Sequence, residues 1–360
     1  EVLKDCTKLG TKIPTSEYLE NGKYPIIDQG QNDIAGYYDS DDGLFEDVPT
    51  IVFGDHTRVV KYVDKPCFLG ADGVKLLCPV DKDINCKYLF YQLSCADIPN
   101  TGYNRHFKWV KALDFKIPSS DEQNHVVEVL DKVTELISLR KQQLAKLDEL
   151  VKARFVEMFG DTKLNPNNFP CCSLSEYIVF LTSGSRGWSQ YFTDSGEYFI
   201  TIKNVKNCKI TLQDVQYVTP PDNAEAKRTR VQENDLLISI TADLGRTGIV
   251  TKKIAEHGAY INQHLTCIRL KQDKLNPLYV AYYMESDAGK EQFVAKNQSA
   301  VKAGLNFNAI NSLKLMVPPL ALQNQFATFV ERVDQQKQTV QQGLEKLELM
   351  KKALMQEYFG

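Results

Sequence analysis

Two stretches of the chain share one spacing of hydrophobic positions. Side chains of one stripe recur at alternating steps of four and three residues over 126–158 and again over 326–358. A heptad pattern of this length is typical of long helices that pack through a narrow apolar stripe. The stripe positions are Val126, Leu130, Val133, Ile137, Arg140, Leu144, Leu147, Val151, Arg154 and Met158, then Phe326, Val330, Val333, Lys337, Val340, Leu344, Leu347, Lys351, Leu354 and Tyr358. We therefore predict two long helices, each beginning shortly after a proline and ending at a glycine.

The two predicted helices are copies of one another. Residues 115–160 align without gaps with residues 315–360, and 13 of the 46 aligned positions are identical. Identical pairs include Pro118 and Pro318, Gln123 and Gln323, and Asn124 and Asn324. A helix of ~38 residues at ~1.5 Å per residue is ~57 Å long, more than one small domain needs. We expect the helices to pair as an antiparallel coiled coil; two separate surface helices on globular cores are the alternative.

The segments before each helix repeat more faintly. The echoes are ENGKYPII (20–27) with DSGEYFIT (194–201), TIVF (50–53) with LLIS (236–239), FLGADGVKLL (68–77) with AYINQHLTCIRL (259–270), and NCKYLFYQL (85–93) with NPLYVAYYM (276–284). Short β-branched runs broken by Gly, Asn and Asp predict many strands, with one short helix near residues 88–94 and 279–286. The fold class we predict is α+β. Its parts are a first mixed domain (1–120), a first spacer helix (121–160), a second mixed domain (161–315) and a second spacer helix (316–360).

Composition is typical of a globular protein, and we expect the cytoplasm as its location. No apolar run approaches the ~18 residues that span a bilayer, and the charged start EVLKDCTKLG does not resemble a signal peptide. The nine cysteines are odd in number and form no CxxC pair, which favours free thiols. We expect no bound metal, because no set of histidines and cysteines has the spacing of a zinc site.

Charge and motif searches limit the function further. The formal net charge of the 360 residues is −3, which argues against a simple basic nucleic-acid binder, so we expect any basic surface to be local. GADGVK lacks the spacing of a phosphate-binding P-loop. NPNNF (165–169) is not the catalytic motif of an amino-methyltransferase, and the acidic residues near 221–227 lie too close together for a nuclease metal site. We expect no catalytic residues.

The stretch GDHTR (54–58) crowds Asp, His, Thr and Arg after a predicted strand. One reading is a catalytic loop, but no nucleophile or second orienting group accompanies His56. A second reading is a turn at Gly54 and Asp55 with His56 bonded locally. The third is a loop that faces a nucleic acid, with Arg58 near phosphates or guanine edges. The partial echo at LLISITADLGRT keeps the strand and Arg246 but not the Asp-His pair, which favours a recognition element.

A duplicated globule on long helices suits a bipartite target, because tandem symmetry in a reader mirrors half-site spacing in DNA. Nine motifs stand in the same order as in a known family. They are KYPIIDQGQNDIAGYY, IVFGDHTRVVKYVD and FLGADGVKLL in the first domain, TSGSRGWSQYF, EYFITIKNVKN, NDLLISITADLGRTGIV and AYINQHLTCIRL in the second, and the helix openings PSSDEQNHV and PPLALQNQF. Together they resemble the DNA-specificity subunit of type I restriction-modification systems, over essentially the whole chain.

The resemblance implies a non-catalytic subunit in which two target-recognition domains each read half of a split sequence in double-stranded DNA. It implies that the helices set the gap and dock two adenine-methylating (modification) subunits, with restriction/translocase subunits joining for cleavage. S-adenosylmethionine, ATP and magnesium would then be used by those partners, and this chain would bind no cofactor. Because the chain opens abruptly at EVLKDC, we also expect an N-terminal extension to be missing.

Polar side chains on the predicted loops are the candidate DNA contacts. Asn and Gln can pair with adenine in bidentate fashion, and Arg or Lys with guanine or phosphate. The candidates are Gln29, Gln31, His56, Thr57, Arg58, Lys61, Lys75, Tyr103, Asn104, Arg105 and Lys108 in the first domain, and Ser185, Arg186, Trp188, Lys203, Asn204, Lys206, Asn207, Arg246, Asn262, Gln263 and Lys302 in the second. Asn262 could instead tie down backbone, and the basic run AKRTR (226–230) could be a solvated loop. The alternative for the whole chain is a protein-interaction scaffold that binds no DNA.

Overall fold

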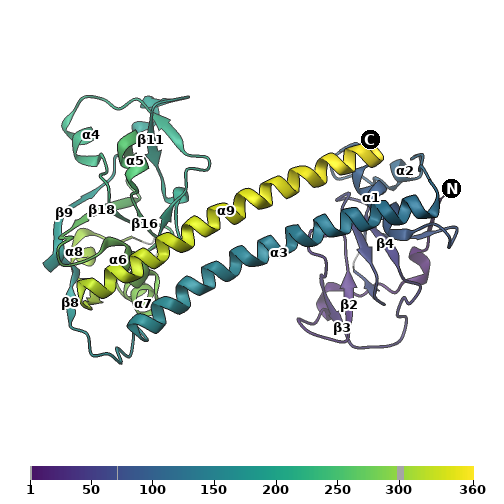
Figure 1. Cartoon of the computed structure of the whole chain (residues 1–360), viewed down its shortest axis with the longest axis horizontal. Helices are drawn as coiled ribbons and strands as arrows, with labels where there is room; N and C mark the ends of the chain where they lie inside the picture. Colours follow the sequence, from purple (N-terminus) through teal and green to yellow (C-terminus); the bar gives the residue numbers. More distant parts are fainter. Residues whose placement is uncertain (1, 71, 298–303) are drawn as a thin grey trace. The chain divides into compact units, whose positions relative to one another are not determined.

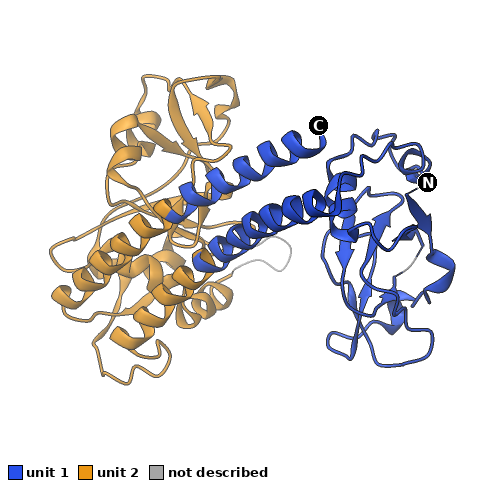
Figure 2. Ribbon diagram, turned by 45° about the vertical axis from the view of Figure 1, so that its right-hand side comes forward, with its two compact units in different colours: residues 1–143, 340–360 blue, residues 144–339 orange. Residues whose placement is uncertain are grey.

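The protein consists of two compact units. The computed structural model describes residues 2–70, 72–297 and 304–360 (Figure 1). Unit 1 comprises residues 1–143 and 340–360, and unit 2 comprises residues 144–339 (Figure 2). Each unit therefore contains one globular part and a segment from each of the two long helices. The predicted division at residues 120, 160 and 315 is a different partition of the chain and stays a prediction.

Unit 1 is built on a four-stranded antiparallel sheet. Its strand order is β1 (Leu3–Asp5), β7 (Val74–Pro79), β4 (Thr50–Gly54) and β5 (Val60–Val63). All five residues of strand β4 are buried. Since successive side chains of a strand point to opposite faces, both faces of β4 are covered. Ile51 and Phe53 pack with helix α1 (Cys86–Cys95), whereas Val52 packs in a separate apolar cluster with Leu76.

A smaller sheet completes unit 1. Strand β2 (Tyr24–Ile27) pairs antiparallel with β3 (Gly36–Tyr38) and parallel with β6 (Phe68–Leu69). The remaining short elements are helix α2 (Phe107–Val110) and the 3-10 turns η1 (Thr7–Leu9) and η2 (Thr15–Glu17). Parallel pairing brings the carboxyl ends of β2 and β6 to one edge of the sheet.

Unit 2 repeats this plan. Its antiparallel sheet has the order β9 (Ile178–Ser183), β18 (Leu265–Leu270), β15 (Leu236–Ser239) and β16 (Thr247–Ile249). In its second sheet, β11 (Glu197–Ile200) is parallel to β17 (Ala259–Ile261) and antiparallel to β14 (Gln216–Val218), which also pairs with β10 (Phe192–Thr193). Strands β7, β4 and β5 thus correspond to β18, β15 and β16, and the parallel pair β2 and β6 corresponds to β11 and β17.

Unit 2 carries additional short elements. Two small antiparallel ladders join β12 (Val205–Lys206) to β13 (Lys209–Ile210) and β8 (Cys171–Ser173) to β19 (Lys314–Met316). The helices are α4 (Ala224–Thr229), α5 (Lys252–His257), α6 (Pro277–Glu285), α7 (Asp287–Ala295) and α8 (Phe307–Asn311), and the 3-10 turns are η3 (Leu174–Tyr177), η4 (Trp188–Tyr191) and η5 (Ile202–Asn204). Helices α1 and α6 stand where the sequence predicted one short helix per domain, which confirms the repeat of mixed domains.

The two long helices are α3 (Ser120–Phe159) and α9 (Leu320–Phe359). They begin shortly after Pro118 and Pro319 and end before glycines, as predicted. Every predicted stripe position except Arg140 is buried or half-buried. No helix within the described residues is long and apolar enough to cross a membrane.

Within each unit the segments of the two long helices contact one another and run antiparallel. In unit 2, Asp148 forms an ion pair with Lys337, and Phe159, further along α3, packs on Phe326, earlier in α9, with ring centroids 5.6 Å apart. In unit 1, Lys141 pairs with Glu348 at 3.0 Å. These contacts are antiparallel; coiled-coil packing of the pair stays a prediction.

The identical residues at the start of each long helix form the same hydrogen-bonded clamp in both units. In unit 1 the Gln123 amide donates to the carbonyl oxygen of Pro118 at 2.9 Å and accepts from the backbone N–H of Asn85 at 2.9 Å. Asn85 caps the N-terminus of α1 and also donates to Asn124 at 2.8 Å.

In unit 2 the corresponding distances are 2.8 Å from Gln323 to Pro318, 2.8 Å from Asn276 N to Gln323, and 2.9 Å from Asn276 to Asn324. Asn276 caps α6 just as Asn85 caps α1. The clamp fastens a helix of each globular part to its long helix, which explains why Pro, Gln and Asn recur at these positions of the repeat.

Candidate nucleic-acid interface

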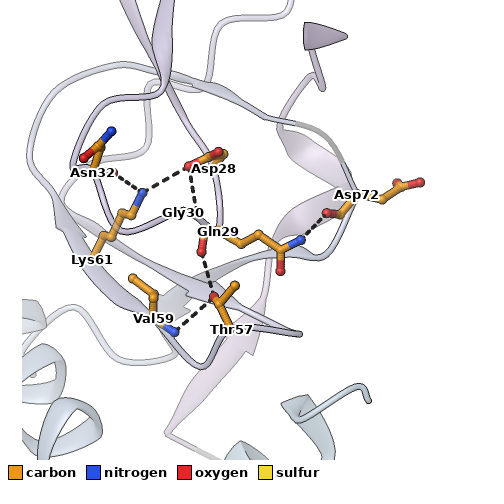
Figure 3. Close-up of polar contacts among 8 residues, drawn as sticks. All are labelled: Asp28, Gln29, Gly30, Asn32, Thr57, Val59, Lys61 and Asp72. Atoms are coloured by element: carbon orange, nitrogen blue, oxygen red, sulfur yellow. Dashed lines mark hydrogen bonds and ion pairs between the residues drawn. The ribbon is translucent and has the colours of Figure 1, made fainter. Parts of the chain in front are cut away.

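Three loops of unit 1 meet where β2, β4 and β6 end. The backbone N–H of Gly70 donates to the carbonyl of Ile27 at 2.8 Å, and that of Asp55 donates to Gly73 at 2.7 Å. These bonds hold the loop after β2, the turn after β4 and the loop after β6 together, and Figure 3 shows side-chain contacts that also join these loops, from Gln29 to Thr57 and to Asp72. Most of the predicted first-domain candidates lie on or beside this edge, which is the candidate site of unit 1.

Unit 2 makes the corresponding bonds at the corresponding edge. The backbone N–H of Asn262 donates to Ile200 at 3.1 Å, and that of Ile240 donates to His264 at 3.0 Å. A further loop, after β9, joins this edge through Ser185, whose N–H donates to the carbonyl of Ile261 at 2.9 Å. The scaffold of the edge is therefore the same in both units, while the side chains on it differ.

The stretch GDHTR forms a turn rather than an acid-base pair. Asp55 is 4% exposed, and its carboxylate accepts from the N–H of Phe107 at 2.7 Å. The His56 ring contacts the carbonyl of Asn104 through Nδ1 at 3.2 Å. Arg58 takes a left-handed backbone with φ of 61°, and its guanidinium donates to the carbonyl of Ile98 at 3.0 Å. Asp55 and Arg58 thus hold the turn to neighbouring chain segments.

Gln29 is a brace between loops. Its amide oxygen accepts from the N–H of His56 at 3.2 Å. Its amide nitrogen donates to the carbonyl of Asp72 at 2.9 Å, as Figure 3 shows. Its own carbonyl accepts from the hydroxyl of Thr57 at 2.7 Å. Because both ends of the amide are engaged, Gln29 cannot pair with adenine in bidentate fashion without breaking the brace, and we revise its predicted role accordingly.

Lys61 lies inside unit 1. Its side chain is 4% exposed, and its ammonium contacts Asp28 at 3.3 Å and the carbonyl of Asn32 (Figure 3). A buried ammonium requires such partners, since an unpaired buried charge is costly. Lys61 therefore supports the loop that carries Gln31, which is exposed. Its predicted contact with DNA is corrected to a supporting role.

Lys75 is half-buried and also engaged. Its ammonium lies 2.8 Å from Asp5. Burial opposes ionisation of Asp5, but hydrogen bonds from Lys75 and Thr7 outweigh it and lower the pKa of the Asp5 carboxyl. Lys75 is thus a weaker candidate for phosphate contact than an unpaired lysine.

Three candidates of unit 2 are buried for structural reasons. Ser185 is 2% exposed, with its hydroxyl 3.2 Å from that of Thr229. Trp188 is 3% exposed; its ring stacks on Phe199 at 5.8 Å. Asn204 is 3% exposed; it is the last residue of η5, and its side chain accepts from the N–H of the N-cap residue Thr201 at 3.0 Å, which completes a capping box. We revise all three from predicted DNA contacts to supports of the loops around them, because their side chains are buried and bonded or packed internally. Residue type alone did not reveal this burial.

Other unit 2 candidates are partly engaged. Arg246 forms an ion pair with Asp243 on the turn after β15. Asn262 is half-buried and its side chain accepts from the N–H of His264 at 3.2 Å, in keeping with the backbone-tying alternative. Gln263 is half-buried, with its amide nitrogen 3.4 Å from Nε2 of His264. Lys302 lies outside the described residues.

The basic run AKRTR is not the solvated loop that was one expectation. Residues 224–229 form α4. Arg228 donates to the carbonyl of Ser183 at 2.9 Å, and Arg230 pairs with Glu197 at 3.2 Å. These two arginines therefore attach α4 and the residue after it to neighbouring strands.

Five predicted cations remain exposed with no ion pair to any residue in the described part of the chain. They are Arg105, Lys108, Arg186, Lys203 and Lys206. An exposed cation without a carboxylate partner can meet a phosphate without first losing an internal bond. These side chains, with exposed Gln31, Thr57, Tyr103, Asn104 and Asn207, form the accessible part of the candidate interface.

Sequence reasoning missed several residues that build the edge. His106 is fully buried and donates from its backbone N–H to the Asp55 carbonyl at 2.8 Å. In unit 2, Glu285 accepts from the N–H groups of Cys208 at 3.0 Å and Thr247 at 2.9 Å. Only the recurrence of Asn at the start of NCKYLFYQL and NPLYVAYYM signalled a structural residue in advance. The described residues hold no cluster of three or more side chains suited to a metal ion.

Two units with one strand order, one clamp and different polar side chains at the same edge define a tandem protein of duplicated binding domains. Residues 2–149 and 189–349 match the family described as the type I restriction modification DNA specificity domain. The chain belongs to this family. The matched segments begin in each globular part and run into each long helix, so they cover both copies of the repeat.

Similar proteins agree with this assignment. The chain is 24% identical, over 97% of its length and 86% of the relative, to a putative type I restriction enzyme MjaX specificity subunit of Methanocaldococcus jannaschii. It is 19% identical, over 92% of its length and 84% of the relative, to the type I restriction enzyme EcoR124I/EcoR124II specificity subunit of Escherichia coli. The fold is similar to the crystal structure of a type I restriction-modification system S subunit from M. genitalium, with a TM-score of 0.61, 16% identity, and coverage of 99% of this chain and 93% of the other.

Proposed function

We propose that this chain is the specificity subunit of a type I restriction-modification complex and that each unit reads one half of a split sequence in double-stranded DNA. The observation that carries the proposal is the duplicated edge. Backbone hydrogen bonds at the ends of β2 and β4 recur at β11 and β15, whereas the side chains on the two edges differ. A repeated backbone framework with different side chains at the strand ends suits two domains that recognise different half-sites.

The contacts and exposure of the side chains at each edge assign them different roles in DNA binding. Exposed unpaired cations such as Arg105 and Arg186 would meet phosphates and set the register on the duplex. Exposed polar side chains such as Gln31 and Asn207 would meet base edges. Buried groups such as Lys61 and Asn204 would hold the loops in shape, so that the readers are positioned before DNA arrives.

The chemistry of the complex would belong to partner subunits. In this proposal the chain is not itself an enzyme; two adenine-methylating subunits and restriction/translocase subunits join it and use S-adenosylmethionine, ATP and magnesium. Support comes from the GDHTR turn, where Asp55 bonds to Phe107 and His106 instead of forming a dyad with His56. The long helices offer exposed apolar side chains, among them Leu136, Leu139 and Leu349, as a docking surface for the methylating subunits.

The decisive experiment is genomic. Sequencing of modified adenines with and without this gene should reveal a split motif that appears only with the gene. Methylation that is independent of the gene would refute the proposal. If the chain assembles with its partners but the complex binds DNA no better than the partners alone, the protein-scaffold alternative is favoured. The purified chain alone should neither transfer a methyl group from S-adenosylmethionine nor cut DNA.

A second experiment tests the helices as a spacer. Insertion of one heptad into α3 after Gln143 and into α9 after Thr339 lengthens each helix by ~10 Å, which corresponds to about three base pairs at ~3.4 Å each. The methylated motif should keep both half-sites and widen the gap between them. An unchanged gap would refute the spacer role while leaving DNA recognition intact.

A further inference from the structure

Tyr103 of unit 1 presents an aromatic ring to solvent. It lies between α1 and α2 and is 85% exposed, more than any other large apolar or aromatic side chain in the described residues. Its ring is parallel to the imidazole of His56, with the centroids 4.6 Å apart and the planes 7° apart. One face of Tyr103 is thus backed by His56, and a flat face remains free.

The base of this stack is fixed by hydrogen bonds. The backbone N–H of His56 donates to the Gln29 amide oxygen at 3.2 Å, and Nδ1 of His56 lies 3.2 Å from the carbonyl oxygen of Asn104. A carbonyl oxygen only accepts, so Nδ1 carries a proton. The brace thus holds the backbone of His56, and the residue that follows Tyr103 holds its imidazole.

The loop that carries Tyr103 is anchored at its far end. The backbone N–H of His106 donates to the carbonyl of Asp55 at 2.8 Å, and its Nδ1 contacts the same oxygen at 2.9 Å. The N–H of Phe107 donates to the Asp55 carboxylate at 2.7 Å. The Tyr103 loop and the GDHTR turn therefore form one bonded assembly, which lowers the entropy lost when the ring engages a ligand.

The surroundings of the ring are polar and basic. Arg105 and Lys108 are exposed and have no ion pair with any described residue. The corresponding turn of unit 2, residues 240–246, contains no histidine or aromatic residue, so it holds no counterpart of His56. The ring that backs Tyr103 is therefore a feature of the unit 1 turn.

We propose that Tyr103, backed by His56, stacks on a base that is partly unstacked within the half-site bound by unit 1. This inference rests on the proposed function. A backed aromatic face beside unpaired cations has the two features with which proteins hold an unstacked base, a stacking surface and phosphate contacts. Reading of an intact groove would instead use polar edges. Unit 1 would thus deform its half-site through a ring whose backing histidine has no counterpart on the corresponding turn of unit 2.

The test uses the full chain with its methylating subunits and a duplex that contains the methylated motif. 2-Aminopurine replaces each base of the unit 1 half-site in turn, except the adenine that is methylated, because a methylating subunit extrudes its own target base. Its fluorescence changes where a base leaves the duplex stack. We expect a change at one position with the wild-type chain and with Tyr103→Phe, and none with Tyr103→Ala. Loss of stacking on one base should weaken binding about 5- to 150-fold.

Matched variants separate the outcomes. Leu9→Ala removes another exposed apolar side chain of unit 1, 66% exposed, and should leave both readouts unchanged. A mismatch at the responsive position should tighten binding of the wild-type chain more than that of Tyr103→Ala, because the base is already unstacked.

Unchanged affinity and fluorescence in Tyr103→Ala would overturn this inference without touching the proposed function. Assembly with the methylating subunits that fails in Tyr103→Ala without DNA would identify a protein contact and also overturn it. Absence of DNA binding by the wild-type complex would refute the proposed function itself.

Discussion

Replacement of Gln323 by methionine should destabilise unit 2 strongly although no apolar contact is lost. The Gln323 side chain is fully buried, with its amide nitrogen 2.8 Å from the carbonyl of Pro318 and its amide oxygen 2.8 Å from the N–H of Asn276. Methionine has a similar length but cannot replace either bond.

The magnitude follows from the two backbone groups left without a partner. A buried group that loses its hydrogen bond costs about 1–3 kcal/mol, and Asn276 N–H is only partly buried, so the expected loss is about 2–5 kcal/mol. Denaturant unfolding gives the free energy of unfolding, and amide hydrogen exchange locates the change. The N–H of Asn276 should lose protection in Gln323→Met.

Two variants of the same type serve as controls. Gln325→Met lies two residues away on an exposed face and should change the free energy of unfolding by less than about 0.5 kcal/mol. Gln123→Met removes the equivalent bonds in unit 1, so protection should fall at Asn85 and stay at Asn276. A loss below about 1 kcal/mol in Gln323→Met, with Asn276 still protected, would refute the clamp as a source of stability.

Three further outcomes follow from the structure. Arg186→Ala should weaken binding of the unit 2 half-site alone and reduce the salt dependence of binding by about one phosphate contact, measured by titration at several salt concentrations; equal weakening at both half-sites would contradict its placement. In thiol labelling of the native chain, exposed Cys171 should react quickly, whereas Cys67 should react only on unfolding because burial raises its pKa to about 12; early labelling of Cys67 would be inconsistent with its burial. Because the pKa of Asp5 is lowered in the folded state, its carboxylate contributes stability above its ordinary pKa near 3.8, and this stability is lost as the pH falls through the lower folded pKa. Asp5→Asn should therefore flatten the acid side of a curve of unfolding free energy against pH, and an unaltered acid side would contradict the sign. Lys75→Met should raise the pKa of Asp5 measured by NMR.

Much of the fold was predictable because it rests on periodic patterns and repetition. The heptad stripe located both long helices, and all stripe positions except Arg140 are buried or half-buried. The echo between TIVF and LLIS predicted β4 and β15 as corresponding strands, and the structure has them in corresponding sheet positions. These signals survive in sequence because burial of one helix face or one strand requires apolar side chains at fixed intervals.

The candidate site was predictable only in outline. The GDHTR turn was correctly placed after a strand, β4, but residue type did not distinguish side chains that could contact DNA from those that support the loops. Lys61 and Asn204 have the chemistry of DNA contacts and are buried, held by Asp28 and Thr201 respectively. Tyr103 was one candidate among many until its stacking on His56, 47 positions earlier in the chain, became visible.

The sequence by itself determined the duplicated plan, the two long helices and the family resemblance, because these depend on order and spacing along the chain. Only the tertiary structure decided which polar side chains face solvent. It also showed that the repeated Gln and Asn residues clamp each long helix to a short one, through Asn85 in unit 1 and Asn276 in unit 2. The physical reason is that hydrogen bonds between distant segments satisfy buried polar groups, and such pairings leave no period in the sequence.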